Sequence, residues 1–135
     1  MIAERRKYMH PISEILCRTY EELRKNGQVS FPLTEEGKKA LDSVIKTVNS
    51  IYFGIERFPT DEDKAVAYLV HIIKRHALTD GNKRLGLLWF QVWCDVRNLS
   101  PKEPVFGYDA LAIAIEATEP DELDKTIKIV QSILF

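Results

Sequence analysis

Two stretches of helical periodicity flank the nonapeptide His-Ala-Leu-Thr-Asp-Gly-Asn-Lys-Arg, which spans residues 76–84. Apolar residues recur with helical spacing over Asp61–Arg75, and again from Leu85 to about Arg97. The nonapeptide is therefore predicted to be a loop that joins two helices and enters the second at its N-terminus. Backbone N–H groups are unpaired at a helix start and carry the positive end of the helix dipole, so this loop is a candidate phosphate-binding site.

Two side chains of this loop can carry chemistry on a phosphate. His76 is a candidate general base, because an imidazole can accept a proton from an attacking hydroxyl near neutral pH. Asp80 offers the hard oxygen ligand that Mg²⁺ prefers. A His with an Asp four positions later is by itself an ordinary helix-surface pair. Six fixed residues at this spacing, however, are expected by chance in only about one chain per million of this length.

The following residues are predicted to bind the anion. Gly81 permits a close approach of the backbone, and Asn82 is predicted to cap the second helix or to orient His76 or a phosphate. Lys83 and Arg84 add two cations, of which the guanidinium presents a planar bidentate fork. We therefore expect a nucleotide with Mg²⁺ to be bound at this loop.

The nonapeptide resembles the signature of the Fic/Doc family. That signature reads His-x-Phe-x-Asp/Glu-Gly-Asn-Gly-Arg in Fic proteins and His-x-Phe-x-Asp-Ala-Asn-Lys-Arg in the Doc (death-on-curing) branch. The resemblance implies that His76 is the base and that Asp80 is the Mg²⁺ ligand. It also implies that Gly81 and Asn82 form the anion-binding turn and that Arg84 is the phosphate-binding arginine.

Four positions distinguish the two branches or depart from both. Lys83 replaces the second glycine of the Fic form, and Leu87 stands where Fic proteins carry a second arginine. Both features are shared with Doc. Gly81 is Ala in Doc and so matches the Fic form instead. Leu78 replaces the usual Phe and is expected to anchor the loop by its apolar side chain.

The resemblance implies an enzyme that uses ATP and Mg²⁺ to modify a Ser, Thr or Tyr hydroxyl of a target protein. Doc-like phosphorylation is the first hypothesis, favoured by Lys83 and Leu87, and AMP transfer is the alternative, favoured by Gly81. A catalytically silent module that binds a nucleotide or a partner is the second alternative, against which the intact His76 and Asp80 argue. By analogy with Doc, the target would be a translation factor, and the enzyme would be restrained by a separate antitoxin or by another domain of a longer protein.

The rest of the chain predicts an all-α fold, a compact Fic/Doc-type helical bundle formed as a single domain over residues 1–135. The helix after the nonapeptide is apolar almost all round and is predicted to be the buried central helix, with Trp89, Phe90 and Trp93 in the core. His71 is predicted to be a partly buried helix residue. The expected helices span residues 12–25, 35–51, 61–75, 85–97, 108–117 and 120–134.

Residues 52–59 lie between two predicted helices and place β-favouring residues around a glycine. In Fic/Doc proteins the equivalent stretch is a flap that pairs with an extended segment of the target, and strand addition is a common way to hold a peptide. The candidate docking residues of this small β-like flap are Phe53, Gly54, Ile55 and Glu56. The alternative is a plain interhelical loop with buried aromatic side chains.

Charge and hydropathy exclude several other classes. The net charge is −1, whereas a nucleic-acid-binding domain is usually basic, so no direct nucleic-acid binding is expected. The longest apolar run, Leu85–Cys94, is too short to span a bilayer. The charged segment Met1–Lys7 is not followed by the apolar run of a signal peptide. A cytoplasmic protein without membrane attachment is therefore expected.

Overall fold

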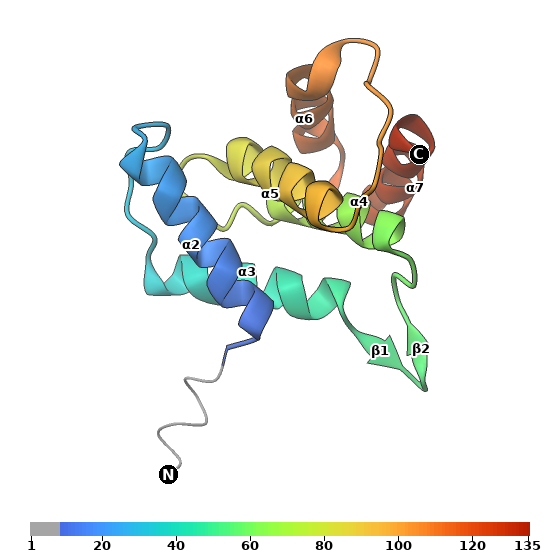
Figure 1. The fold of residues 1–135 in the computed structure, drawn as a ribbon, viewed down its shortest axis with the longest axis horizontal. Coiled ribbons are helices and arrows are strands. Elements are labelled where there is room, and N and C mark those ends of the chain that lie inside the picture. Colours follow the sequence, from blue (N-terminus) through green and yellow to red (C-terminus); the bar gives the residue numbers. More distant parts are fainter. Residues whose placement is uncertain (1–8) are drawn as a thin grey trace.

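The computed structural model describes residues 9–135, so the segment on which the signal-peptide prediction rests lies outside the described residues. Over this range all regular structure is helical apart from one short hairpin, which confirms the predicted all-α class (Figure 1). The elements are α2 (Pro11–Lys25), α3 (Glu35–Val48), β1 (Ile51–Tyr52), β2 (Ile55–Glu56), α4 (Asp61–Arg75), α5 (Asn82–Val96), α6 (Gly107–Ala117), the 3₁₀ turn η1 (Pro120–Glu122) and α7 (Leu123–Leu134).

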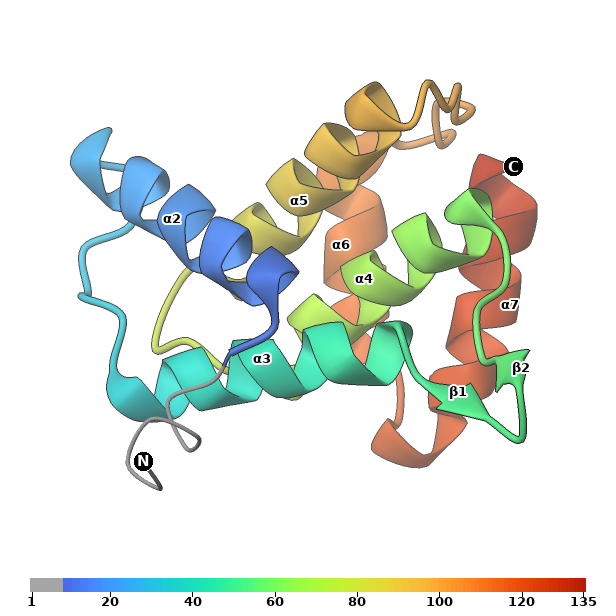
Figure 2. The same ribbon diagram turned by 60° about the horizontal axis from the view of Figure 1, so that its bottom comes forward.

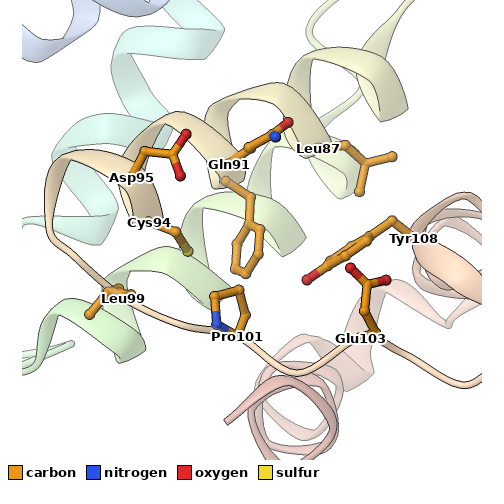
Figure 3. A pocket seen from close by; sticks show the side chains of 9 residues that line it. Leu87, Gln91, Cys94, Asp95, Leu99, Pro101, Glu103 and Tyr108 are labelled. Atoms are coloured by element: carbon orange, nitrogen blue, oxygen red, sulfur yellow. The ribbon is translucent and has the colours of Figure 1, made fainter.

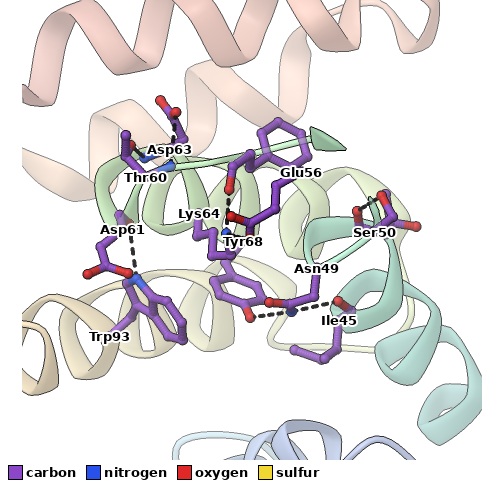
Figure 4. Close-up of polar contacts among 12 residues, drawn as sticks. Ile45, Asn49, Ser50, Glu56, Thr60, Asp61, Asp63, Lys64, Tyr68 and Trp93 are labelled. Atoms are coloured by element: carbon purple, nitrogen blue, oxygen red, sulfur yellow. Dashed lines mark hydrogen bonds and ion pairs between the residues drawn. The ribbon is translucent and has the colours of Figure 1, made fainter. Parts of the chain in front are cut away.

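The helix starts follow from local capping. The Thr34 hydroxyl accepts a hydrogen bond from the Gly37 N–H at 2.9 Å, which sets the start of α3. At α4 the Thr60 hydroxyl accepts from the Asp63 N–H at 2.9 Å, and the Asp63 carboxylate accepts from the Thr60 N–H (Figure 4). Such a reciprocal pair satisfies two N–H groups that the helix itself leaves without a partner. These helix starts were readable from the sequence for that reason.

The central helix of the bundle is α4, and not α5 as the sequence predicted. Every residue from Ala65 to Ile73 is buried, and α4 contacts α3, α5, α6 and α7. Figure 2 shows α4 in the middle of the bundle with these helices around it. The charged residues of α4 are confined to its two ends, so its uncharged middle can be enclosed on every side. Helix α5 exposes Gln91, Asp95 and Val96.

The aromatic residues of α5 lie in the core, as predicted. Trp89, Phe90 and Trp93 are each less than a tenth exposed. The Trp93 indole N–H donates to the Asp61 carbonyl at 3.0 Å and its ring packs edge-on against Tyr68, with centroids 4.9 Å apart (Figure 4). These contacts fix α5 against α4 in a defined register.

Residues 51–56 form an antiparallel hairpin that projects beyond the bundle (Figure 1). The predicted β-like element is therefore confirmed. Its turn is made by Phe53 and Gly54, both with positive φ, and Phe53 is fully exposed, so the alternative with a buried aromatic is wrong there. The Lys64 ammonium anchors the hairpin by an ion pair with Glu56 at 3.0 Å (Figure 4).

Among residues 9–135, no helix combines the length and the apolarity that a membrane span requires.

Candidate active site

Residues 76–81 of the nonapeptide form the predicted loop between α4 and α5, and its last three residues already belong to α5, which begins three residues earlier than predicted. His76 ends α4 in the left-handed conformation (φ 51°, ψ 42°), and its side chain is exposed. Leu78 is buried beneath the loop, which confirms its predicted anchoring role. Gly81, at φ 91°, occupies the cap position of α5. The loop thus leaves one helix and enters the next through two left-handed residues.

Asn82 is not the helix cap that the sequence predicted, because Gly81 takes that position and Asn82 is the first residue of α5. Its side chain instead closes the loop by two hydrogen bonds to Leu78. The carboxamide oxygen accepts from the Leu78 N–H at 3.1 Å, and the amide nitrogen donates to the Leu78 carbonyl at 3.0 Å. No described side chain caps the start of α5, so its first N–H groups have no side-chain partner, as at other anion-binding helix starts.

Gly81 lies directly on Val29, a buried residue of the segment between α2 and α3. A Cβ atom at position 81 would come within 2.5 Å of the Val29 Cγ1 atom. The Ala that Doc carries at this position would therefore overlap Val29 here. The sequence gives no local sign of the contact between Val29 and the loop, because only the packing of α2 and α3 brings them together.

Replacing Gly81 with alanine is expected to destabilise the protein by at least about 1–2 kcal/mol, from its left-handed backbone alone. The overlap with Val29 adds to that cost, so Gly81→Ala should cost less in a Val29→Ala background than in the original protein. Chemical denaturation of the four proteins measures this coupling. If the free-energy costs of Gly81→Ala and Val29→Ala were strictly additive, the contact between residues 81 and 29 would be contradicted.

The four cations near the loop have different partners. Arg84 donates to the carbonyl of Gln28, and Lys83 forms an ion pair with Glu116 of α6 at 3.0 Å. Lys74 donates to two carbonyls at the C-terminal end of α6, and Arg75 donates to a hydroxyl of α3. Lys74, Arg75 and Lys83 therefore each link two helices, and of the four only Lys83 and Arg84 line the pocket described next.

A pocket of about 390 Å³ opens over the loop. Its lining consists of Gln28, Thr79, Asp80, Gly81, Asn82, Lys83, Arg84 and Glu116. Five predicted site residues therefore meet around one cavity, while His76 lies at the beginning of the loop and does not line it. Three lining residues, Gln28, Thr79 and Glu116, were not predicted. For Glu116 and Gln28 the sequence carries no local signal, since each reaches the pocket from another element.

The donor set of this pocket fits a metal ion that arrives with its substrate. Within residues 9–135, no group of three or more His, Cys, Asp or Glu side chains is arranged to hold a metal ion. Asp80 is exposed and lines the pocket. Mg²⁺ commonly binds one or two carboxylates and completes its shell with water and substrate phosphates, which Asp80 and a bound nucleotide would provide.

A second pocket of about 450 Å³ lies between α5 and the segment that leads to α6 (Figure 3). It contains no residue of the nonapeptide, and its lining consists of Leu87, Phe90, Gln91, Cys94, Asp95, Leu99, Pro101, Glu103 and Tyr108. Burial raises the pKa of the Cys94 thiol to about 11, so the thiol is protonated at neutral pH and is a poor nucleophile. This second pocket therefore offers neither a residue of the predicted site nor a reactive thiolate.

His71 takes no part in either pocket. It is buried in α4, and burial, together with Arg57 and Arg75, lowers the pKa of its imidazole to about 4. It is neutral at pH 7 and packs edge-on against Phe58. His71 is the helix residue that was predicted, but it is buried and not only partly so, and His76 is the histidine that the fold leaves accessible at the loop.

The family model of the Fic/DOC family matches residues 6–94, more than half of the chain, and the chain therefore belongs to the Fic/DOC family. Among curated proteins, it is similar to Toxin Doc of Mycolicibacterium smegmatis, with 36% identity over 75 residues. That match covers 54% of this chain and 56% of the relative, so the chain spans about half the length of the curated relative it matches. No solved structure gave a significant match. The similarity is to a protein of the Doc branch, in agreement with the branch that Lys83 and Leu87 indicate.

Proposed function

We propose that this chain is a Fic/Doc-type transferase that uses ATP with Mg²⁺ to phosphorylate a hydroxyl side chain of a target protein. One observation carries the proposal: the uncapped start of α5 faces a pocket that also holds Asp80, Lys83 and Arg84. Unpaired N–H groups and two cations can bind phosphate oxygens, and the adjacent carboxylate can hold the accompanying ion.

In the proposed reaction the target hydroxyl attacks the γ-phosphorus of ATP. The new bond joins the hydroxyl oxygen to phosphorus, the bond from phosphorus to the β,γ-bridging oxygen breaks, and ADP leaves. His76 accepts the hydroxyl proton, and Arg84 and the N–H groups of α5 stabilise charge on the transferred group. Mg²⁺, when bound at Asp80, would neutralise charge on the phosphates. Because His76 does not line the pocket, the target hydroxyl is expected to approach from the His76 end of the loop.

The exposed hairpin is proposed to hold the target chain. Ile51, Tyr52, Phe53 and Ile55 are each more than half exposed, and the free backbone edge of a two-stranded hairpin can accept a third strand. Similarity to Toxin Doc supports a toxin-type role, acting in the cytoplasm on a translation factor and restrained by a separate antitoxin.

AMP transfer remains the alternative reaction, favoured by Gly81, which matches the Fic signature. In that case the hydroxyl would attack the α-phosphorus and pyrophosphate would leave. The same side chains would serve both reactions, and the orientation of the bound nucleotide would decide between them.

ATP labelled at either the α or the γ phosphate distinguishes these reactions. The purified protein is incubated with Mg²⁺ and a bacterial lysate, with a His76→Ala variant alongside. Protein labelled only from the γ position, and only by the unaltered protein, is the expected result. Label from the α position would establish AMP transfer instead. No label from either position, in lysates from several bacteria, would favour the catalytically silent module.

A further inference from the structure

Glu116 lies in the last turn of α6, where its side chain reaches the pocket over the loop. Negative charge at the C-terminal end of a helix is unfavourable, because the unpaired carbonyls there carry the negative end of the dipole. Two ammonium groups offset this unfavourable interaction of the Glu116 carboxylate with the helix dipole. Lys83 pairs with its carboxylate at 3.0 Å, and Lys74 donates to its backbone carbonyl at 3.1 Å. Glu116 is thus fixed at the pocket by both α4 and α5.

The charged side chains that line the pocket cancel one another. Lys83 and Arg84 contribute two positive charges, and Asp80 and Glu116 contribute two negative charges. Without Glu116 the pocket would have a net positive charge and would attract any polyphosphate. With Glu116 present, a phosphate that approaches Lys83 also meets a carboxylate about one ion-pair distance from that ammonium.

We propose that Glu116 is a specificity-determining residue that makes the pocket select metal-complexed over free nucleotide, by cancelling the charge of Lys83. The proposal rests on the proposed function, because it takes a nucleotide as the ligand of the pocket. Coulomb energy scales with the charge of the ligand. Free ATP carries two more negative charges than its Mg²⁺ complex, so the Glu116 carboxylate repels the free form more strongly.

The test measures the affinity of Glu116→Gln for a non-hydrolysable ATP analogue by titration calorimetry at low ionic strength, with excess Mg²⁺ and with EDTA. The ratio of the Kd of the free analogue to that of its Mg²⁺ complex is expected to fall by roughly threefold or more, through tighter binding of the free analogue. Glu119→Gln is the matched control. It makes the same charge change at an exposed position that does not line the pocket, and it should leave the ratio unchanged.

Two results would overturn the proposal. An unchanged ratio in Glu116→Gln would show that the carboxylate does not discriminate between the two forms. Weaker binding of the Mg²⁺ complex, with no gain for the free analogue, would assign Glu116 as a metal ligand instead. If the unaltered protein bound neither form of the analogue, the proposed function would fail as well. If the labelled-ATP assay showed transfer but the Kd ratio did not change in Glu116→Gln, only the inference about Glu116 would fail.

A Lys83→Met background tests whether Glu116 acts through the ammonium. The gain in free-analogue affinity from Glu116→Gln is expected to be smaller there, because part of the gain in the original background comes from the Lys83 ammonium, which no longer pairs with Glu116 and can contact the phosphates. An equal gain in both backgrounds would overturn the assigned route. Thermal unfolding of each variant checks that the fold is retained, which is expected because both side chains are partly exposed.

Discussion

Replacing His76 with alanine is expected to reduce phosphoryl transfer by about 10²–10⁴-fold, the usual contribution of a general base, while the protein remains folded. The side chain is exposed and lies past the last residue of α4, so its removal opens no cavity in the core. The γ-label assay measures the rate, and thermal unfolding measures the fold. Full activity in His76→Ala would contradict the proposed proton transfer.

The backbone at His76 requires a second variant. The residue is left-handed, a conformation that costs an alanine about 1–2 kcal/mol but costs a glycine little. His76→Gly should therefore be as inactive as His76→Ala and more stable than it. If activity instead followed stability across the two variants, the loss would reflect the loop conformation and not the imidazole.

Replacing Asp80 with asparagine is expected to lower turnover on the order of 10²-fold at limiting Mg²⁺, because the side chain keeps its shape but loses the charge that holds the ion. The rate should be measured over a range of Mg²⁺ concentrations, and the half-saturating concentration should rise. Raising Mg²⁺ should restore part of the lost activity, since the nucleotide still brings the ion.

Asp95→Asn is the matched control for this experiment. It makes the same change on α5, at an exposed residue that lines the pocket of Figure 3 and does not line the one over the loop. Its Mg²⁺ dependence should match that of the unaltered protein. If Asp80→Asn also had the Mg²⁺ dependence of the unaltered protein, Asp80 would not be the Mg²⁺ ligand.

Features decided by local chemistry were predictable from the sequence. The start of α4 follows from Thr60 and Asp63, which cap it within one turn. The start of the loop after Arg75 was placed correctly because helical periodicity stops there, whereas its end was placed three residues too late, since α5 begins at Asn82. The hairpin was indicated by β-favouring residues around Gly54, whose positive φ makes the turn.

Features decided by tertiary contact were not predictable. Apolar content made α5 look central, but enclosure depends on how many helices surround a segment, and α4 has neighbours on all sides. Asn82 is a good capping residue by type, yet its side chain found closer partners across the loop at Leu78. Glu116 belongs to the site only because α6 returns to the start of α5.

The position of α4 also has a consequence for biosynthesis. Contacts between α4 and α5 are close in sequence and can form early, whereas α6 and α7 cover α4 from residues made later. Until those helices leave the ribosome, the apolar run Ala65–Ile73 is only partly enclosed and the pocket lacks its Glu116 wall. A nascent chain that already contains the whole nonapeptide therefore has an incomplete pocket until α6 has been translated, and an incompletely covered α4 until α7 follows.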